Sequence, residues 1–261
     1  MRHYTPAEYD AVMESVRNGV GLRETGRRLN IPWDIVKSWK NGVKPRSIVG
    51  YQQEYHIPES SKALTPAKAY ILGVLCGDGW MKEGGYLLSL NVMDREFIDR
   101  FAEKVLCQYG KSCRVYEDKR PSFRCDVSSN QIHADLLGYF GGINPKCYEW
   151  RVPKDVLNGA DPIKVEFLKG FFDSEGSVNS NGRGQVIIGV NNKEGLLEVQ
   201  KLLTDLGIES RFGECWHKQR NKMRYFLTLT VRGNNGRKAF YDKIGFTITR
   251  KQAILEAAVN R

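Results

Sequence analysis

The feature that most constrains this chain is a nine-residue pattern that occurs twice, at 71–79 and at 168–176. Each copy is a short apolar run that contains a glycine and closes with an acid followed by another glycine. The acids are Asp78 and Glu175. A repeat that carries an acid at the same place predicts two related half-domains that bring two carboxylates together. Paired carboxylates of this kind are typical of a site for a divalent metal ion.

Helical spacing explains the small residues in both copies. Residues four apart share one face of a helix, and here that face holds Gly73 with Gly77 in the first copy and Gly170 with Ser174 in the second. Such faces let two helix backbones approach closely. We expect each acid in the last turn of its helix, and the glycine that follows it to end the helix as a left-handed cap. These capping glycines would be Gly79 and Gly176.

The predicted position of the two acids is unfavourable without a cation. The helix dipole disfavours a negative charge near a helix C-terminus. Two neighbouring carboxylates also repel each other, which raises the pKa of at least one. A bound cation relieves both effects, so the pattern indicates Mg²⁺. A core helix followed by an ordinary turn explains one copy equally well, but it explains two matched copies poorly.

The two copies resemble, position by position, the motif of the LAGLIDADG homing endonucleases of the single-chain type. The resemblance covers roughly Thr65 to the C-terminus. It implies that Mg²⁺ or Mn²⁺ is the cofactor. The residues that it assigns to the metal are Asp78, Glu175, Gly77 and Ser174, and those that it assigns to helix packing are Gly73 and Gly170.

The copies differ at their sixth position, which is Cys76 in the first and Asp173 in the second. In the family this position does not bind the metal. The difference therefore leaves the nuclease interpretation intact.

The hydrophobic pattern predicts an α+β chain in which each half runs helix, strands, helix, strands, helix. The halves are 65–155 and 156–261, and the second half ends with an extra helix over 250–259. The resemblance implies a pseudo-two-fold pair of αββαββα half-domains whose two sheets form a DNA-binding saddle. A twisted antiparallel sheet with long basic side chains on one face can lie in the major groove.

A second correspondence lies near the end of each half. A glycine, an apolar residue and a short spacer lead to Lys146 in the first half and to Lys251 in the second. In the family, basic residues flank the metals and stabilise charge at the scissile phosphates, which makes these lysines catalytic candidates. The alternative is that both are surface lysines at helix starts.

Charge favours an anionic partner. The chain has 40 Lys and Arg against 30 Asp and Glu, a formal net charge of +10, and nucleic acid is the commonest partner of such a chain. Polar residues on the predicted strands are candidates for DNA contact, although each of them also fits a solvated face. They are Arg114, Tyr116, Arg124, Gln185, Arg211, His217, Arg224 and Thr228.

Residues 1–43 look like a separate helical unit. Thr5 and Glu8 form a capping-box pattern before a first helix, and two further short helices separated by a turn at 30–32 resemble the helix-turn-helix of resolvases and sigma factors. Such units bind DNA or serve as plain packing caps. The candidate DNA contacts are Arg27, Arg28, Lys37 and Lys40. Residues 44–64, without clear periodicity, are predicted to be a linker.

Other classes of protein find little support in the sequence. The six cysteines include no CxxC pair, and the four histidines lack ligand spacing. A signal peptide and a membrane span are not visible, so we expect an intracellular protein that is not secreted and does not contact membranes. The chain lacks a nucleophilic first residue and a terminal His-Asn, which disfavours a complete intein; an intron-borne or free-standing gene for intron homing fits better.

The sequence thus predicts a monomeric, metal-dependent, sequence-specific endonuclease. It would make a staggered double-strand cut across the minor groove of a long asymmetric DNA site, without a protein partner. A non-catalytic DNA-binding transcription regulator is an alternative, although such a protein would be expected to lose an acid. An RNA-binding intron maturase is another.

Overall fold

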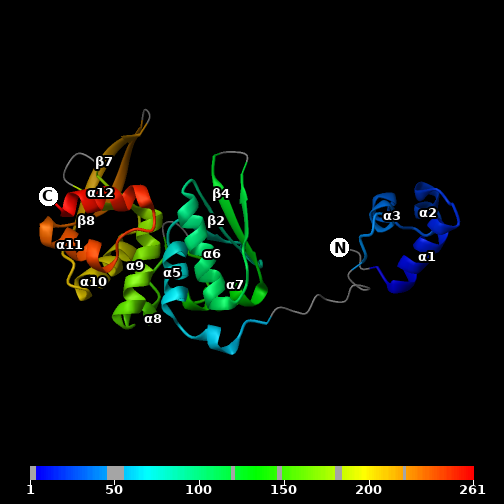
Figure 1. Ribbon diagram of the computed structural model, residues 1–261, viewed down its shortest axis with the longest axis horizontal. Coiled ribbons are helices and arrows are strands. Elements are labelled where there is room, and N and C mark those ends of the chain that lie inside the picture. The colour runs from blue at the N-terminus through cyan, green and yellow to red at the C-terminus, as the bar shows by residue number, and fades with distance from the viewer. Residues whose placement is uncertain (1–3, 46–55, 119–120, 146–148, 180–183, 220–221) are drawn as a thin grey trace. The chain divides into compact units, whose positions relative to one another are not determined.

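The computed structural model describes residues 4–45, 56–118, 121–145, 149–179, 184–219 and 222–261 (Figure 1). It does not describe the side chains of 215, 217–219 and 222–224. The chain divides into two compact units, Met1–His56 and Ile57–Arg261. In the part of the chain that the structure describes, no helix is long and apolar enough to cross a membrane.

The described part of the smaller unit folds as three short helices, α1 (Pro6–Arg17), α2 (Leu22–Arg28) and α3 (Trp33–Lys40). The capping box forms as predicted: Thr5 N donates to Glu8 Oε2 at 2.7 Å, and Glu8 N donates to Thr5 Oγ1 at 3.2 Å. The helices close on a small buried core of Val12, Ile31, Val36 and Trp39. The predicted helix order is confirmed, while the DNA-binding role of the unit stays a prediction.

The first half of the larger unit has the predicted αββαββα order. Its four strands form an antiparallel sheet in the order β1-β2-β4-β3, and α6 packs against β2 and β4 (Figure 1). The apolar residues of β4, Cys125 and Val127, are buried on the helix side, as the alternation predicts. The elements are α5 (Pro66–Leu75), β1 (Gly79–Met81), β2 (Leu87–Val92), α6 (Arg95–Tyr109), β3 (Arg114–Glu117), β4 (Phe123–Ser128) and α7 (Asn130–Tyr139).

The second half repeats this order. Its sheet runs β5-β6-β8-β7, the same topology as in the first half. The elements are α9 (Asp161–Glu175), β5 (Gly176–Val178), β6 (Val186–Val190), α10 (Lys193–Asp205), β7 (Ser210–Gln219), β8 (Lys222–Val231) and α11 (Gly233–Lys243), followed by α12 (Thr249–Val259). A short helix, α8 (Lys154–Leu157), precedes α9. The predicted pair of α+β half-domains is confirmed.

The two halves meet along α5 and α9, which lie side by side (Figure 1). Glycine makes the contact possible. A Cβ atom added at Gly73 would lie 2.1 Å from the Phe167 carbonyl oxygen, and one added at Gly170 would lie 2.2 Å from the Tyr70 carbonyl oxygen. Since both obstructing atoms are backbone, no side-chain rearrangement would relieve them. The predicted helix-packing role of the two glycines agrees with this geometry.

The prediction of left-handed helix caps was wrong. Gly176 has φ −74° and ψ 141°, and Gly79, like Gly176, has no positive φ. Each is instead the first residue of a short strand, β5 and β1, which the sequence did not reveal. A Cβ at Gly79 would lie 2.8 Å from the Val74 carbonyl oxygen, and one at Gly176 would lie 2.5 Å from that of Phe172. Glycine is therefore needed because the strand turns back closely over the helix end.

Part of the predicted linker 44–64 packs on the larger unit, while 46–55 lies outside the described residues. A 3₁₀ helix, η1 (Glu59–Lys62), follows Ile57, whose N–H donates to Gln131 Oε1 at 2.8 Å. Gln108 Nε2 donates to the carbonyl oxygen of the buried Ser61 at 2.7 Å. The larger unit thus begins at Ile57, ahead of the predicted Thr65.

Candidate active site

The two acids come together where α5 and α9 end. Glu175 is the last residue of α9, and Asp78 lies in the turn just after α5, slightly beyond its predicted place in the last turn. A Cβ added at Gly77 would lie 2.4 Å from Ser174 Cβ and 3.2 Å from Glu175 Cγ. The glycine at 77 therefore lets the acid-bearing end of α9 approach the end of α5.

Electrostatics at this point disfavours two free carboxylates. Burial raises the pKa of Glu175 to about 7; repulsion from Asp78 adds to the shift and Lys251 opposes it. Burial also raises the pKa of Asp78, Lys251 opposes this, and Asp94 adds to it. The Asp78 side chain is exposed at the surface, and the desolvation that raises its pKa comes from the protein atoms packed around it. We assign the pKa shift caused by the mutual repulsion mainly to Glu175, the less exposed carboxylate.

The donor set fits a hard divalent cation. Among the described residues, no group of three or more His, Cys, Asp and Glu side chains is arranged to hold a metal ion. The pair Asp78 and Glu175 supplies carboxylate oxygens, and the preceding residues Gly77 and Ser174 supply main-chain carbonyl oxygens. Mg²⁺ is commonly held by one or two carboxylates together with water and substrate phosphates. Two carboxylates whose pKa values are raised by burial and repulsion fit that role.

Lys251 is a buried residue of this site, so its interpretation as a surface lysine was wrong. Its side chain is 8% exposed, and its Nζ donates to the Asp173 carbonyl oxygen at 2.7 Å. Burial lowers the pKa of Lys251, while the nearby Asp173, Asp94 and Asp78 raise it. The amine is thus held within electrostatic reach of both metal-binding candidates. Its predicted counterpart Lys146 lies outside the described residues.

A buried hydrogen-bond network that sequence reasoning missed lies behind Lys251. Asp173 is 1% exposed, and its two carboxylate oxygens accept from Tyr70 OH at 2.7 Å and from Thr247 N at 2.8 Å. These residues come from α5, from α9 and from the loop before α12. The sequence marked Asp173 as a difference between the motif copies, but no local pattern pointed to its partners.

A further contact joins the two halves close to the acids. The Arg250 guanidinium donates two hydrogen bonds of 2.8 Å to the Asp94 carboxylate, and Thr249 N donates to Glu96 Oε1 at 2.8 Å. Asp94 directly precedes α6. It occupies the N-cap position, but its side chain makes no capping hydrogen bond and binds Arg250 across the half-domain boundary instead.

The outward faces of the two sheets correspond position by position. In the first sheet, the register aligns Trp80, Ser89, Asp126 and Arg114 across the strands; in the second it aligns Ser177, Ile187, Thr230 and Arg211. Arg114 and Arg211 therefore occupy equivalent positions, and both are exposed. The pairing of these two candidates was not visible in the sequence, because it depends on strand register.

In the first sheet, basic and aromatic candidates for DNA contact surround the acid Asp126. Asp126 accepts hydrogen bonds from Arg124 Nε at 2.9 Å, Tyr116 OH at 2.8 Å and Ser89 Oγ at 2.6 Å. Although desolvation acts against it, these bonds hold the pKa of Asp126 below its ordinary value. The arrangement fixes Arg124 and Tyr116 on the sheet surface, and the neighbouring Arg114 guanidinium lies over the Tyr116 ring.

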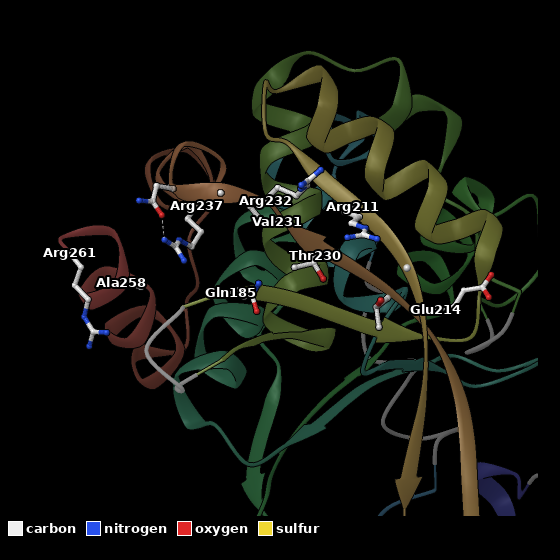
Figure 2. Close-up of a pocket in the computed structure, with 13 residues that line it drawn as sticks. Gln185, Arg211, Glu214, Thr230, Val231, Arg232, Arg237, Ala258 and Arg261 are labelled. Carbon is white, nitrogen blue, oxygen red and sulfur yellow. Dashed lines mark hydrogen bonds between the residues drawn. The ribbon is translucent and has the colours of Figure 1, made fainter.

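The second sheet carries a pocket of about 890 Å³. Figure 2 shows Arg211 on β7 and Thr230 on β8 beside it, with Arg237 and Arg261 coming from the C-terminal helical region. Arginines are well represented in the lining. The lining residues are Gln185, Arg211, Gly213, Glu214, Thr228, Thr230, Val231, Arg232, Gly233, Asn234, Arg237, Ala258 and Arg261. Three DNA-contact candidates, Gln185, Arg211 and Thr228, are thus brought together, while the side chains of His217 and Arg224 lie outside the described ones.

The four basic candidates of the smaller unit are all exposed: Arg27, Arg28, Lys37 and Lys40. Arg28 forms an ion pair with Glu24 at 2.8 Å. Trp33, which the sequence did not single out, is 46% exposed at the start of α3, and the Arg23 and Lys37 side chains lie over its ring. These residues form a basic and aromatic surface on the unit.

Comparison with known proteins gives a family and several relatives. Residues 162–245 match the family described as LAGLIDADG-like domain. An uncharacterised protein of Methanocaldococcus jannaschii is 32% identical over 152 residues, which is 54% of each chain. The homing endonuclease I-ApeI of Aeropyrum pernix is 27% identical over 146 residues, 54% of this chain and 66% of that one. The chain therefore spans between half and two thirds of the length of these curated relatives.

Solved structures share the fold. I-DmoI in complex with DNA and Ca is similar with a TM-score of 0.51 and 17% identity, over 76% of this chain and 99% of that chain. The full-length DUF199/WhiA protein from Thermatoga maritima is similar with a TM-score of 0.52 and 16% identity, over 80% of this chain and 63% of that chain. At these identities the likeness concerns the fold.

Proposed function

The chain belongs to the LAGLIDADG family, and from that premise we propose that it is a site-specific endonuclease that cuts both strands of DNA. The observation that carries this proposal is the pair Asp78 and Glu175 at the joined ends of α5 and α9. Both carboxylates are present, and burial raises the pKa of each. A protein that used the fold only to bind DNA would have no need to keep two repelling acids facing an anionic ligand.

The chemistry of the proposed site follows from its residues. A divalent ion held by Asp78 and Glu175 would supply an activated water and stabilise the leaving oxygen. Lys251 keeps a positive charge next to the two acids and is placed to offset charge on a scissile phosphate. The close packing at Gly73 and Gly170 fixes the spacing of the two acids, and with it the offset between the two cuts. We propose that this offset spans the minor groove and gives staggered ends.

The substrate we propose is double-stranded DNA with a long asymmetric site. The two sheets differ at equivalent positions: Asp126 of the first sheet faces Arg114, whereas Thr230 of the second faces Arg211. Because base contacts carry sequence specificity, two different sheet faces read two different half-sites. Both halves lie in one chain, so a monomer is sufficient. I-DmoI, the neighbour in complex with DNA and Ca, is an example of the fold bound to DNA.

The test starts by selecting the site. The full chain is mixed with a randomised DNA library in a metal-free buffer containing EDTA, and the bound fragments are enriched, sequenced and cloned into a plasmid. Mg²⁺ or Mn²⁺ is then added to the protein and the plasmid. The expected result is a linear product cut at the enriched site. Tight selection of one site without cutting under either metal would indicate a DNA-binding regulator, and selective binding of structured RNA over DNA would indicate a maturase.

A further inference from the structure

Asp173 is linked to both halves of the larger unit and to the loop that leads to Lys251. Its side chain accepts a hydrogen bond from Tyr70 OH on α5 and another from Thr247 N, at 2.7 and 2.8 Å. Its own carbonyl oxygen accepts from Lys251 Nζ at 2.7 Å. One residue of α9 therefore holds both the backbone of the lysine-bearing segment and the lysine amine.

The acceptor in this anchoring is a buried carboxylate. The Asp173 side chain is 1% exposed, and the Thr247 N–H that it accepts from is a main-chain donor. The hydrogen bond therefore holds the backbone of the loop itself. Hydrogen bonds to a charged acceptor are stronger than those between neutral groups. The segment continues directly into α12, whose third residue is Lys251. A displaced loop would therefore displace the amine relative to Asp78 and Glu175.

In the described residues of the first half, no carboxylate occupies the equivalent motif position. Cys76 occupies the motif position that corresponds to Asp173, and it is buried. The corresponding loop is held through Asn144, whose Nδ2 donates to the Met81 carbonyl oxygen at 3.4 Å. The buried Oδ1 of Asn144 has no hydrogen-bond partner among the described residues. The described residues that precede the two lysines are thus held differently: a buried carboxylate accepts from Thr247 N in the second half, and the Asn144 amide donates to Met81 in the first.

We propose that Asp173 is a positioning residue that acts through Lys251, and that it supports the cutting of one DNA strand more than the other. The proposal rests on the endonuclease function proposed above. Asp173 is buried behind Lys251, so its side chain does not contact the DNA. Its contribution is the placement of one amine, and misplacement of a charge-stabilising group by a small distance is enough to slow a reaction strongly.

The experiment measures each strand separately. A duplex with the selected site carries a different fluorophore on each strand, and denaturing electrophoresis gives two single-turnover rates at saturating protein. The variants are Asp173→Asn, Lys251→Met and the double variant, each compared with the full-length protein. Cys76→Ala is the matched control, because it changes the same motif position in the other copy at a buried site. Binding in EDTA and thermal melting accompany every variant.

Asp173→Asn and Lys251→Met are expected to slow the same strand, on the order of tenfold to a hundredfold. The other strand is expected to keep a rate close to that of the unaltered protein, so nicked DNA accumulates. Binding in EDTA stays unchanged. The double variant is no slower on the affected strand than Lys251→Met alone, since the two residues act as one unit. Cys76→Ala leaves both rates unchanged.

Several results would overturn the proposal. Equal slowing of both strands by Asp173→Asn would show a general structural role, and so would additive effects in the double variant. Should Asp173→Asn melt well below the unaltered protein, Tyr70→Phe serves as the second test: it keeps the Thr247 bond, so a strand-specific defect as large as that of Lys251→Met would contradict positioning through the loop. If the unaltered protein cuts neither strand of its selected site, the endonuclease proposal fails instead.

Discussion

At the scale of single residues, the arrangement of the candidate site lowers the stability of the folded protein. Asp78 and Glu175 repel each other at a place where burial already disfavours charge, and natural proteins tolerate such arrangements mainly at functional sites. The positive charge of Lys251 offsets part of this repulsion. Among the described residues, Lys251 forms no ion pair with either acid. The metal-free protein should therefore show the repulsion as a pH-dependent loss of stability.

The Glu175 pKa gives this loss a sign and a window. Its folded value of about 7 lies above the ordinary value of 4.5, so the folded state binds more protons than the unfolded state between these two values. The free energy of unfolding contributed by Glu175 therefore falls as pH rises from about 4.5 to about 7. We expect the fall to be roughly 1–3 kcal/mol.

Thermal melts in EDTA across this range measure the effect. Glu175→Gln, which cannot ionise, should melt at a temperature that changes less with pH than that of the unaltered protein. Added Mg²⁺ or Ca²⁺ should raise the melting temperature of the unaltered protein at pH 7 and above, and much less that of the variant. Identical pH profiles for the two proteins would show that Glu175 is not strained in the metal-free state.

The repeat made part of the site predictable from sequence. Asp78 and Glu175 could be found because they recur within a local motif, and the motif also marked Gly73 and Gly170. The network of Tyr70, Asp173 and Thr247 could not, because its members lie far apart in the chain and meet only through packing of α5, α9 and the loop before α12. The burial of Lys251 is a tertiary property of the same kind.

At the scale of elements, the contact between α5 and α9 carries the architecture. Its closest approaches are between backbones at Gly73 and Gly170. Long helices and regular strands were predictable from hydrophobic periodicity. The three-residue strands β1 and β5 were not, because each begins with glycine and is defined by its pairing with β2 or β6 rather than by its own residues.

Gly73→Ala should disrupt this contact. The new methyl group would lie 2.1 Å from the Phe167 carbonyl oxygen, so the helices must separate. We expect a loss of at least about 2 kcal/mol in the free energy of unfolding of the larger unit, measured by urea denaturation.

Gly138→Ala on α7 is the matched control. A Cβ there meets nothing within 4 Å, and replacing a helical glycine by alanine is expected to be neutral or to stabilise by up to about 1 kcal/mol. Equal stabilities for the two variants would show that the two helices can separate at little energetic cost.

At the scale of the whole molecule, two compact units share one chain. The larger unit contains both acids and both sheets, and it begins at Ile57, where the main chain first bonds to Gln131. The smaller unit has its own buried core and an exposed basic face. From this division we propose that chemistry belongs to the larger unit, and that the smaller one extends the contact with DNA.

A protein that starts at Ile57 should test this division. It should bind the selected site more weakly, with a shallower dependence of log K on log salt concentration, because fewer phosphates are neutralised. Its footprint should shorten at one end only, and it should still cut at high protein concentration. An unchanged footprint and salt slope would identify residues 1–43 as a packing cap.

We expect the paired acids to serve chemistry rather than binding. One paired measurement on the selected site tests this: affinity in EDTA and cutting in Mg²⁺, for the unaltered chain and for Glu175→Gln. The variant is expected to bind as tightly as the unaltered chain or more tightly, because less negative charge faces phosphate, while double-strand cutting is lost. Efficient Mg²⁺-dependent double-strand cutting by Glu175→Gln would contradict the assignment of the site.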